Sequence, residues 1–168
     1  KALITIAHDH GVHFEMLEAV EDVNAMRQLA ALEHIRVLAG GAVKGKRIAF
    51  WGLAFKPKTD DLREAPAMAI AKVLLTEGAK VVGYDPVAGK GAKKELPALE
   101  LAETPLKAAK DADVLAVMTE WDEFRLLDLK TVAKALKTPH VFDGRNVYEL
   151  EAAKEAGLVY ISVGRPAV

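Results

Sequence analysis

The residues best suited to chemistry gather in one stretch, residues 53–63, which follows an apolar run and precedes a helical pattern. The stretch contains an aromatic ring, two cations and two carboxylates, namely Phe55, Lys56, Arg63, Asp60 and Asp61. A lysine is a compact charge that suits a phosphate or hydroxyl oxygen, whereas an arginine is a fork that suits a phosphate or a diol. A phenylalanine ring is a flat apolar surface on which a base or a sugar can pack. These residue types predict a binding loop.

The same loop also has a purely structural interpretation. Charged loops after strands are usually solvated, and Asp61 or Glu64 could cap the helix that follows. The loop lacks the G-x-G-x-x-G turn with which a backbone approaches a pyrophosphate closely. We therefore do not expect this part of the chain to hold a dinucleotide in the usual way.

A second stretch, residues 141–146, also follows a predicted strand and should lie at the same edge of the sheet. Gly144 would let the chain turn sharply there, so that Arg145 could face the same cleft as Lys56. An ordinary turn with a solvent-facing arginine is the alternative interpretation. A third stretch, residues 119–124, mixes polar and aromatic groups, and we interpret its Thr119 or Asp122 as a helix cap.

The five histidines do not predict a metal site. His8, His10 and His13 lie close together in the sequence, and a His-x-His pair can bind a metal ion. Residues two apart on a helix point to different faces, however, so we interpret these side chains as solvated. His34 and His140 have no evident partner. We expect no bound metal.

The elements that must position these residues alternate between strand and helix. Strands are predicted at 47–51, 80–84, 114–118, 140–142 and 158–162, and helices or helical turns at 66–77, 105–110, 126–136 and 149–155. Residues 90–94 are interpreted as an exposed loop. Such alternation with short connections implies a Rossmann-like α/β domain over 44–168, a parallel sheet with helices on both faces. Ligands of such sheets bind beyond the carboxyl ends of the strands, near the point where the strand order reverses.

One long helix is predicted before this domain, from about Phe14 to Leu38. Its apolar residues recur every three or four positions and are Leu17, Val20, Val23, Met26, Leu29, Ala30, Leu32, Ile35 and Leu38. Such a stripe must be buried against another domain or another subunit. We therefore divide the chain into a helical region, residues 1–43, and the sheet domain.

Composition limits the function classes. The 168 residues are 51% hydrophobic and 28% charged with a net charge of −1, an ordinary globular balance without the basic excess of a nucleic-acid-binding protein. The absence of cysteine excludes disulfides and a cysteine nucleophile within this chain. No apolar run approaches the roughly 20 residues of a membrane helix and no signal peptide is visible, so we expect a cytoplasmic protein.

Six segments, in sequence order, resemble motifs of the nucleotide-sugar 6-dehydrogenase family. The first, GLAFKPKTDDLREAP at 52–66, resembles the family pattern GLAFKP-x-TDD-x-R-E-(S/A)-P. The others are GAKV with YDPVA within 78–88, DADV at 111–114, TEW with EF within 119–124, FDGRN at 142–146 and GR at 164–165. The TEW and DGRN elements favour members that act on UDP-glucose over those that act on GDP-mannose or UDP-N-acetylmannosamine.

The resemblance implies an NAD-dependent enzyme of three parts: an NAD-binding domain, a central helical region that dimerises, and a C-terminal Rossmann-like domain that helps to bind the UDP-sugar. It implies that UDP-glucose is oxidised twice at C6, to UDP-glucuronate, with two NAD⁺ and a cysteine thioester intermediate. That cysteine would lie upstream of Lys1. We therefore assign no catalytic residue here and expect this portion to be inactive by itself.

The resemblance also implies roles for individual residues. Phe55, Lys56 and Arg145 are expected to bind UDP-glucose, and Arg63 is expected to reach NAD held by the first domain. The helix at 14–38 is expected to form a homodimer. Two other interpretations remain open, a related nucleotide-sugar dehydrogenase with another base or sugar, and a nucleotide-binding or oligomerisation module without catalysis.

Overall fold

Short runs rich in β-branched and aromatic residues form one sheet in the computed structural model, which describes residues 2–168. The strands are β1 (Arg47–Trp51), β2 (Lys80–Tyr84), β3 (Glu100–Leu101), β4 (Val114–Val117), β5 (His140–Asp143) and β6 (Val159–Ser162). The helices are α1 (Ala2–Asp9), α2 (Glu15–Leu38), α3 (Pro66–Thr76), α4 (Gly89–Glu95), α5 (Pro105–Ala109), α6 (Asp122–Arg125), α7 (Leu129–Ala135) and α8 (Leu150–Glu155). None of these helices combines the length and the apolar content that a membrane crossing requires.

The sheet has the strand order β3-β2-β1-β4-β5-β6, and every neighbouring pair is parallel. Trp51, at the end of β1, lies beside Tyr84 of β2 and Val117 of β4. The chain adds strands on one side of β1 up to β3 and then crosses to β4 on the other side. The order therefore reverses between β1 and β4, and their carboxyl ends flank the expected ligand crevice. The predicted Rossmann-like fold is confirmed.

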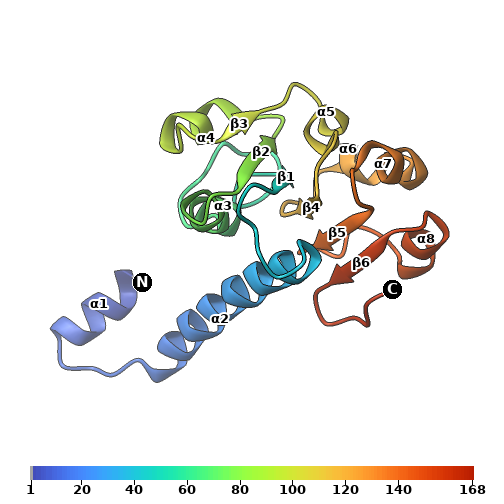
Figure 1. Ribbon diagram of the computed structural model, residues 1–168. Coiled ribbons are helices and arrows are strands. Elements are labelled where there is room, and N and C mark those ends of the chain that lie inside the picture. The colour runs from blue at the N-terminus through green and yellow to red at the C-terminus, as the bar shows by residue number, and fades with distance from the viewer. Residues whose placement is uncertain (1) are drawn as a thin grey trace.

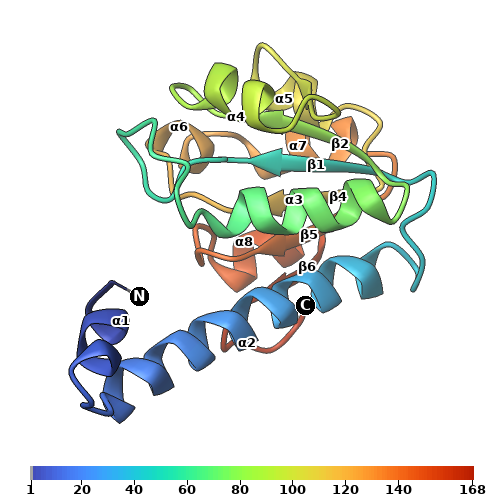
Figure 2. The same ribbon diagram turned by 90° about the vertical axis from the view of Figure 1, so that its left-hand side faces the viewer.

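Helices cover both faces of the sheet (Figure 2). Successive side chains of a strand point to opposite faces, so Phe50 packs in one apolar cluster and Trp51 in another. The first cluster lies under α2, α3 and α4, and the second lies under α5, α6, α7 and α8. In the second cluster Trp51 stacks on Phe124 at 5.2 Å between ring centroids, and its indole N–H donates to the Pro105 carbonyl at 2.8 Å. The Trp51 side chain at the end of β1 is thus fixed by contacts with α6 and with the first residue of α5.

Several local predictions were wrong. Residues 90–94 are not an exposed loop but part of α4, because Ala92 is fully buried against the sheet. The Nζ group of Lys93 donates to two backbone carbonyls, so this lysine-rich segment is anchored at its charged end as well. Helix α7 begins at Leu129 and not at Leu126, because the Asp128 carboxylate caps its first turn. The short elements β3 and α6 were not predicted.

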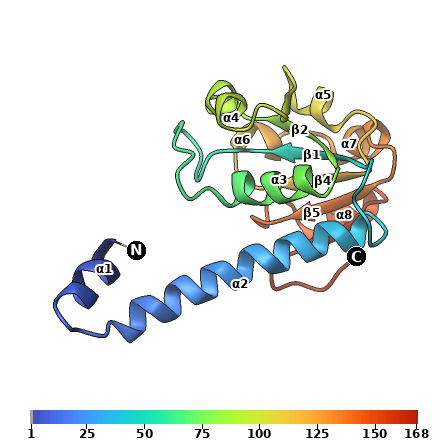
Figure 3. The ribbon, with the colours of Figure 1, turned by 60° about the vertical axis from the view of Figure 1, so that its left-hand side comes forward.

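The N-terminal part of the chain forms an arm that extends from the sheet domain (Figures 1 and 3). The last turns of α2 are buried against the sheet through Leu32, Ile35 and Leu38. The first turns expose large apolar side chains, namely Met16, Val20, Val23, Met26 and Leu29. The predicted stripe is therefore buried on this chain's own sheet over its final third, whereas Met16, Val20, Val23, Met26 and Leu29 stay exposed and Leu17 is half-buried.

Two histidines expected to lack partners have them at this junction. His140 Nδ1 lies 2.6 Å from the Leu38 carbonyl oxygen, at the last residue of α2. His34 stacks on Phe142 of β5, with 5.6 Å between ring centroids. Both contacts join residues far apart in the sequence, which is why the sequence did not show them. They help to fix α2 on the sheet.

Candidate functional site at the carboxyl edge of the sheet

The loops after β1 and β4 touch at the point where the strand order reverses. Gly52 has φ +85°, and a Cβ atom placed there would lie 2.3 Å from the Thr119 Cβ and 2.8 Å from the Thr119 backbone nitrogen. Only glycine fits this backbone conformation and this approach. The Gly52 N–H donates to the Tyr84 carbonyl at 2.8 Å. Gly52 therefore starts the loop in close contact with both neighbouring strands.

A buried carboxylate sets the path of the chain just before the candidate binding residues. Asp85 Oδ2 accepts from the backbone N–H groups of Leu53 at 2.8 Å and Ala54 at 3.1 Å. Its Oδ1 accepts from the N–H groups of Val87 and Ala88. A buried charge is tolerated when it is fully hydrogen-bonded. A strand was predicted to end at residue 84, but this role of Asp85 was not predicted, although an aspartate at a strand end often bonds the backbone of its own turn.

Thr119 provides a second tie on the same loop. Its hydroxyl donates to the Ala54 carbonyl at 2.7 Å. The prediction that Thr119 or Asp122 caps a helix was wrong, because the N-cap of α6 is Trp121 and has no side-chain cap bond. The loop therefore leaves the sheet with Ala54 held at its N–H by Asp85 and at its carbonyl by Thr119.

Arg145 reaches from the end of β5 to both of these loops. Its Nε donates to the Met118 carbonyl at 2.8 Å, and its Nη2 donates to the Phe55 carbonyl at 3.1 Å. Its Nε also lies 3.3 Å from a Glu120 carboxylate oxygen, and the side chain is 32% exposed. Arg145 is thus a bridging side chain and not a purely solvent-facing one. Within residues 2–168 its Nη1 group makes no hydrogen bond, so donors remain for a ligand.

The turn that carries Arg145 is held by a second buried carboxylate, Asp143. Asp143 accepts from the backbone N–H groups of Arg145, Val147 and Tyr148 and from the Tyr160 hydroxyl at 2.7 Å. Burial, and then the negative charge of Asp143, raise the pKa of Tyr160 well above its ordinary value. Tyr160 therefore remains a proton donor to Asp143 throughout the physiological range.

Phe55 and Lys56 are exposed residues of the loop after β1, directly beyond Ala54. Phe55 is 47% exposed, and Lys56 is exposed as well. Within the described chain the Lys56 ammonium makes no ion pair and no hydrogen bond, although its charge makes a minor contribution to the lowered pKa of Asp61. The ammonium is therefore accessible to an anion. The loop after β1 thus exposes a cation and an aromatic residue, and the Phe55 backbone carbonyl holds the Arg145 guanidinium.

Arg63 is arranged differently from Lys56. Its Nε and Nη2 donate to the two carboxylate oxygens of Asp61 at 2.9 and 2.8 Å. Hydrogen bonds from Arg63 lower the pKa of Asp61 to about 2. Asp61 therefore does not cap α3, and neither does Glu64, because the N-cap is Ala65 without a side-chain bond. Arg63 donates to Asp61 whereas Arg145 donates to the Met118 and Phe55 carbonyls, so the two arginines share no hydrogen-bond partner within residues 2–168.

The loop also borders an open hollow of about 510 Å³, lined by residues 59–63 and Glu95. Its charged groups are three carboxylates and the already paired Arg63. This hollow does not suit a phosphate, which points an anionic ligand to the Lys56 side of the loop instead.

Comparisons with known proteins identify the family of this chain. A family model described as the UDP-glucose/GDP-mannose dehydrogenase family, UDP binding domain, matches residues 49–150. These residues include the loops after β1, β4 and β5. The chain belongs to this family.

Individual relatives are similar over nearly the whole chain. A UDP-glucose 6-dehydrogenase of Rhizobium meliloti is 41% identical over 98% of this chain, and one of Bacillus subtilis is 42% identical over 99%. The solved structure of a UDP-glucose dehydrogenase from Pyrobaculum islandicum superposes with a TM-score of 0.79 at 29% identity, covering 95% of this chain and 34% of that one. The chain spans 38% of the length of both curated relatives.

Proposed function

We propose that this chain is the UDP-sugar-binding portion of a UDP-glucose 6-dehydrogenase and that the ligand lies against Phe55, Lys56 and Arg145. The observation that carries the proposal is the exposed Lys56 ammonium, which follows the exposed Phe55 on the loop whose backbone carbonyl holds the Arg145 guanidinium. The choice of ligand is supported by the names of the similar UDP-glucose dehydrogenases and by the description of the matching family domain as UDP-binding.

Each of the three residues has a distinct task in this proposal. The Lys56 ammonium binds a phosphate or sugar hydroxyl oxygen, and the Nη1 donors of Arg145 bind a second acceptor. The Phe55 ring packs against the base or the sugar. Because Met118 and Phe55 carbonyls already hold the guanidinium, little conformational entropy is lost when the ligand arrives.

The complete enzyme is proposed to oxidise UDP-glucose to UDP-glucuronate with NAD⁺, which accepts hydride. The loop after β1 contains no G-x-G-x-x-G turn, so this sheet does not fit the cofactor's pyrophosphate in the usual way. Arg63 fits a contact with NAD held elsewhere, since its Nη1 stays free while Asp61 binds the other two nitrogens. We place the reaction in the cytoplasm, where the thiol that the family chemistry requires stays reduced.

The arm is proposed to form a homodimer. Its exposed apolar side chains follow one another at helical spacing along the first turns of α2, and a stripe of this kind is buried in stable proteins. We also keep, as a proposal, a division at residue 44 between this helical region and the sheet domain. The last turns of α2 nevertheless pack in the core of the sheet domain.

The proposal is tested by Lys56→Ala in the complete enzyme, with Lys58→Ala as the matched control on the same loop. Loss of one charge-assisted hydrogen bond should weaken UDP-glucose binding by about 1.5–3 kcal/mol, or roughly 10- to 150-fold, as measured by calorimetry. The control should bind normally. Unchanged affinity for Lys56→Ala would contradict the assignment.

Base and sugar specificity need a separate measurement. A calorimetric panel of UDP-glucose, GDP-mannose and a UDP-N-acetyl sugar on the complete enzyme distinguishes the proposed substrate from those of related enzymes. Tightest binding of GDP-mannose would show that the family is right and the substrate wrong.

A further inference from the structure

A cluster of possible metal ligands lies where α1 turns back onto α2. His8 belongs to α1, His13 to the connection, and Glu18 to the first turn of α2. One ligand atom from each residue lies within 4.8 Å of the others. His8 Nε2 is 2.6 Å from Glu18 Oε1, and the rings of His8 and His13 meet edge to face at 5.5 Å between centroids.

The backbone brings these groups together through a tight reversal. Gly11 takes φ +71°, and the Val12 N–H donates back to the Ala7 carbonyl at 2.8 Å. This reversal returns the chain toward His8. The expectation of no metal rested on the spacing of His8 and His10, and His10 is outside the cluster. His13 lies beyond the helix, so the periodicity of α1 does not govern it.

We propose that His8, His13 and Glu18 bind one divalent transition-metal ion, and that Zn²⁺ suits the set best. Two imidazole nitrogens and one carboxylate oxygen are common zinc ligands, and Ca²⁺ or Mg²⁺ would prefer oxygen alone. Tetrahedral zinc needs ligand atoms about 3.3 Å apart at bonds of roughly 2.0–2.1 Å. Small rotations of the side chains, which are partly or fully exposed, reach that spacing, because the three atoms already lie within 4.8 Å. Solvent supplies the fourth ligand.

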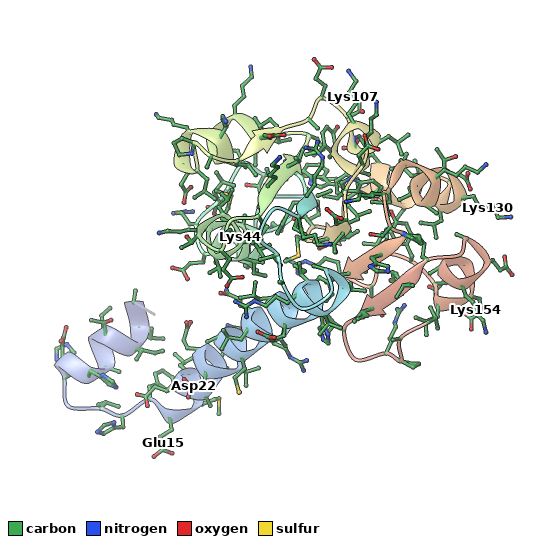
Figure 4. All side chains as sticks on the ribbon, viewed as in Figure 1. Glu15, Asp22, Lys44, Lys107, Lys130 and Lys154 are labelled. Carbon is green, nitrogen blue, oxygen red and sulfur yellow. The ribbon has the colours of Figure 1, made fainter. Side chains whose placement is uncertain are left out.

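The ion would act as a clamp between the two helices of the arm. The cluster connects the end of α1 to the start of α2, and Figure 1 shows α1 beside this end of α2, away from the sheet. Glu15 and Asp22, labelled in Figure 4, mark this projecting end of α2. Binding should therefore order α1 and add to the stability of the arm.

The test uses the untagged chain, in which no cysteine competes for the ion. Zn²⁺ titration by calorimetry should give one site, and Co²⁺ should give the visible absorption bands of a tetrahedral complex. His8→Ala, His13→Ala and Glu18→Gln should each weaken binding at least tenfold. The control variants His10→Ala and His34→Ala should bind as the parent does.

Two results would overturn the proposal. One is the absence of stoichiometric Zn²⁺ binding and of Co²⁺ bands in a chain whose circular dichroism shows it folded. The other is binding that survives loss of His8 and His13 or that falls equally with His10. In either case the contact between His8 and Glu18 is an ordinary ion pair and nothing more.

Discussion

The carboxyl edge of the sheet and the projecting arm differ in whether their side chains find partners within this chain. At the edge, Asp85 and Asp143 are buried carboxylates that each accept from four donors of the same chain. On the arm, apolar side chains such as Met16 and Leu29 are 75% and 63% exposed. Groups at the edge are thus joined by hydrogen bonds within the described chain, whereas the arm leaves large apolar side chains exposed.

This difference predicts where a substitution should act. A change at the edge should alter folding stability and the position of Lys56, because the loop is held by backbone hydrogen bonds within one domain. A change on the exposed part of the arm should alter association and leave the folding of the sheet domain intact. The predictions below test the contrast, from the largest effect to the smallest.

Gly52→Ala should have the largest effect. The new Cβ would stand 2.3 Å from Thr119 Cβ in a left-handed backbone conformation, which should cost about 2–5 kcal/mol of unfolding free energy. Gly164→Ala is the control, because its φ is +70° with open space around it, and the cost should be about 1–2 kcal/mol. Urea denaturation of both variants measures the difference. Equal losses would show that the two loops do not meet as closely as described.

Asp85→Asn should rank next. The amide keeps one accepting oxygen but turns an NH₂ group toward two of the four backbone N–H donors, which should cost about 2–3 kcal/mol. Asp60→Asn, an exposed change of the same chemistry, should stay within about 0.5 kcal/mol. Denaturation together with amide exchange at Leu53 and Ala54 measures both effects. Unchanged exchange at these two amides would show that Asp85 does not hold this loop.

Val23→Lys tests the arm. Val23 is 47% exposed on α2, so a lysine should leave the melting temperature of the sheet domain nearly unchanged while dissociating the proposed dimer. Sedimentation velocity should show the sedimentation coefficient falling toward that of a monomer. Leu126→Lys, on the exposed surface of the sheet domain, is the control and should not dissociate it. A dimer that survives Val23→Lys would place the interface elsewhere.

The smallest effect concerns the exposed pair of Arg63 and Asp61. The pKa of Asp61 is lowered to about 2, so the pair is intact above the ordinary value of about 3.9 and is lost as pH falls toward 2. Carboxyl NMR of Asp61 should show this low midpoint, and Arg63→Ala should return it toward about 3.9. A midpoint near 4 in the parent protein would show that Arg63 is not held by Asp61.

Much of the fold could be predicted from the sequence because its signals are local. Strand and helix patterns alternate with short connections, and this alone implies a parallel sheet with ligands beyond its carboxyl edge. Helix α4 was not predicted because its lysines are typical of a solvated loop, although Ala92 is buried. The short strand β3 has only two residues, too few for any period to be visible.

The residues of the candidate site could be predicted from the sequence, but the contacts between them could not. Lys56 and Arg145 follow predicted strands, so a shared edge could be inferred. The bond from Arg145 to the Phe55 carbonyl joins residues 90 positions apart, and the bonds from Leu53 and Ala54 to Asp85 span 32 and 31 positions. Such links depend on strand order and register, which a sequence pattern does not specify. The cluster of His8, His13 and Glu18 was hidden for a different reason, because it depends on the chain reversal at Gly11.

The most direct test of the central claim is to map a bound UDP-sugar on the complete protein by amide NMR. The account predicts that UDP-glucose shifts the resonances of Phe55, Lys56 and Arg145 and that Lys56→Ala weakens the binding that causes these shifts. Shifts confined to the hollow lined by residues 59–63 and Glu95, with Lys56 and Arg145 unaffected, would contradict it.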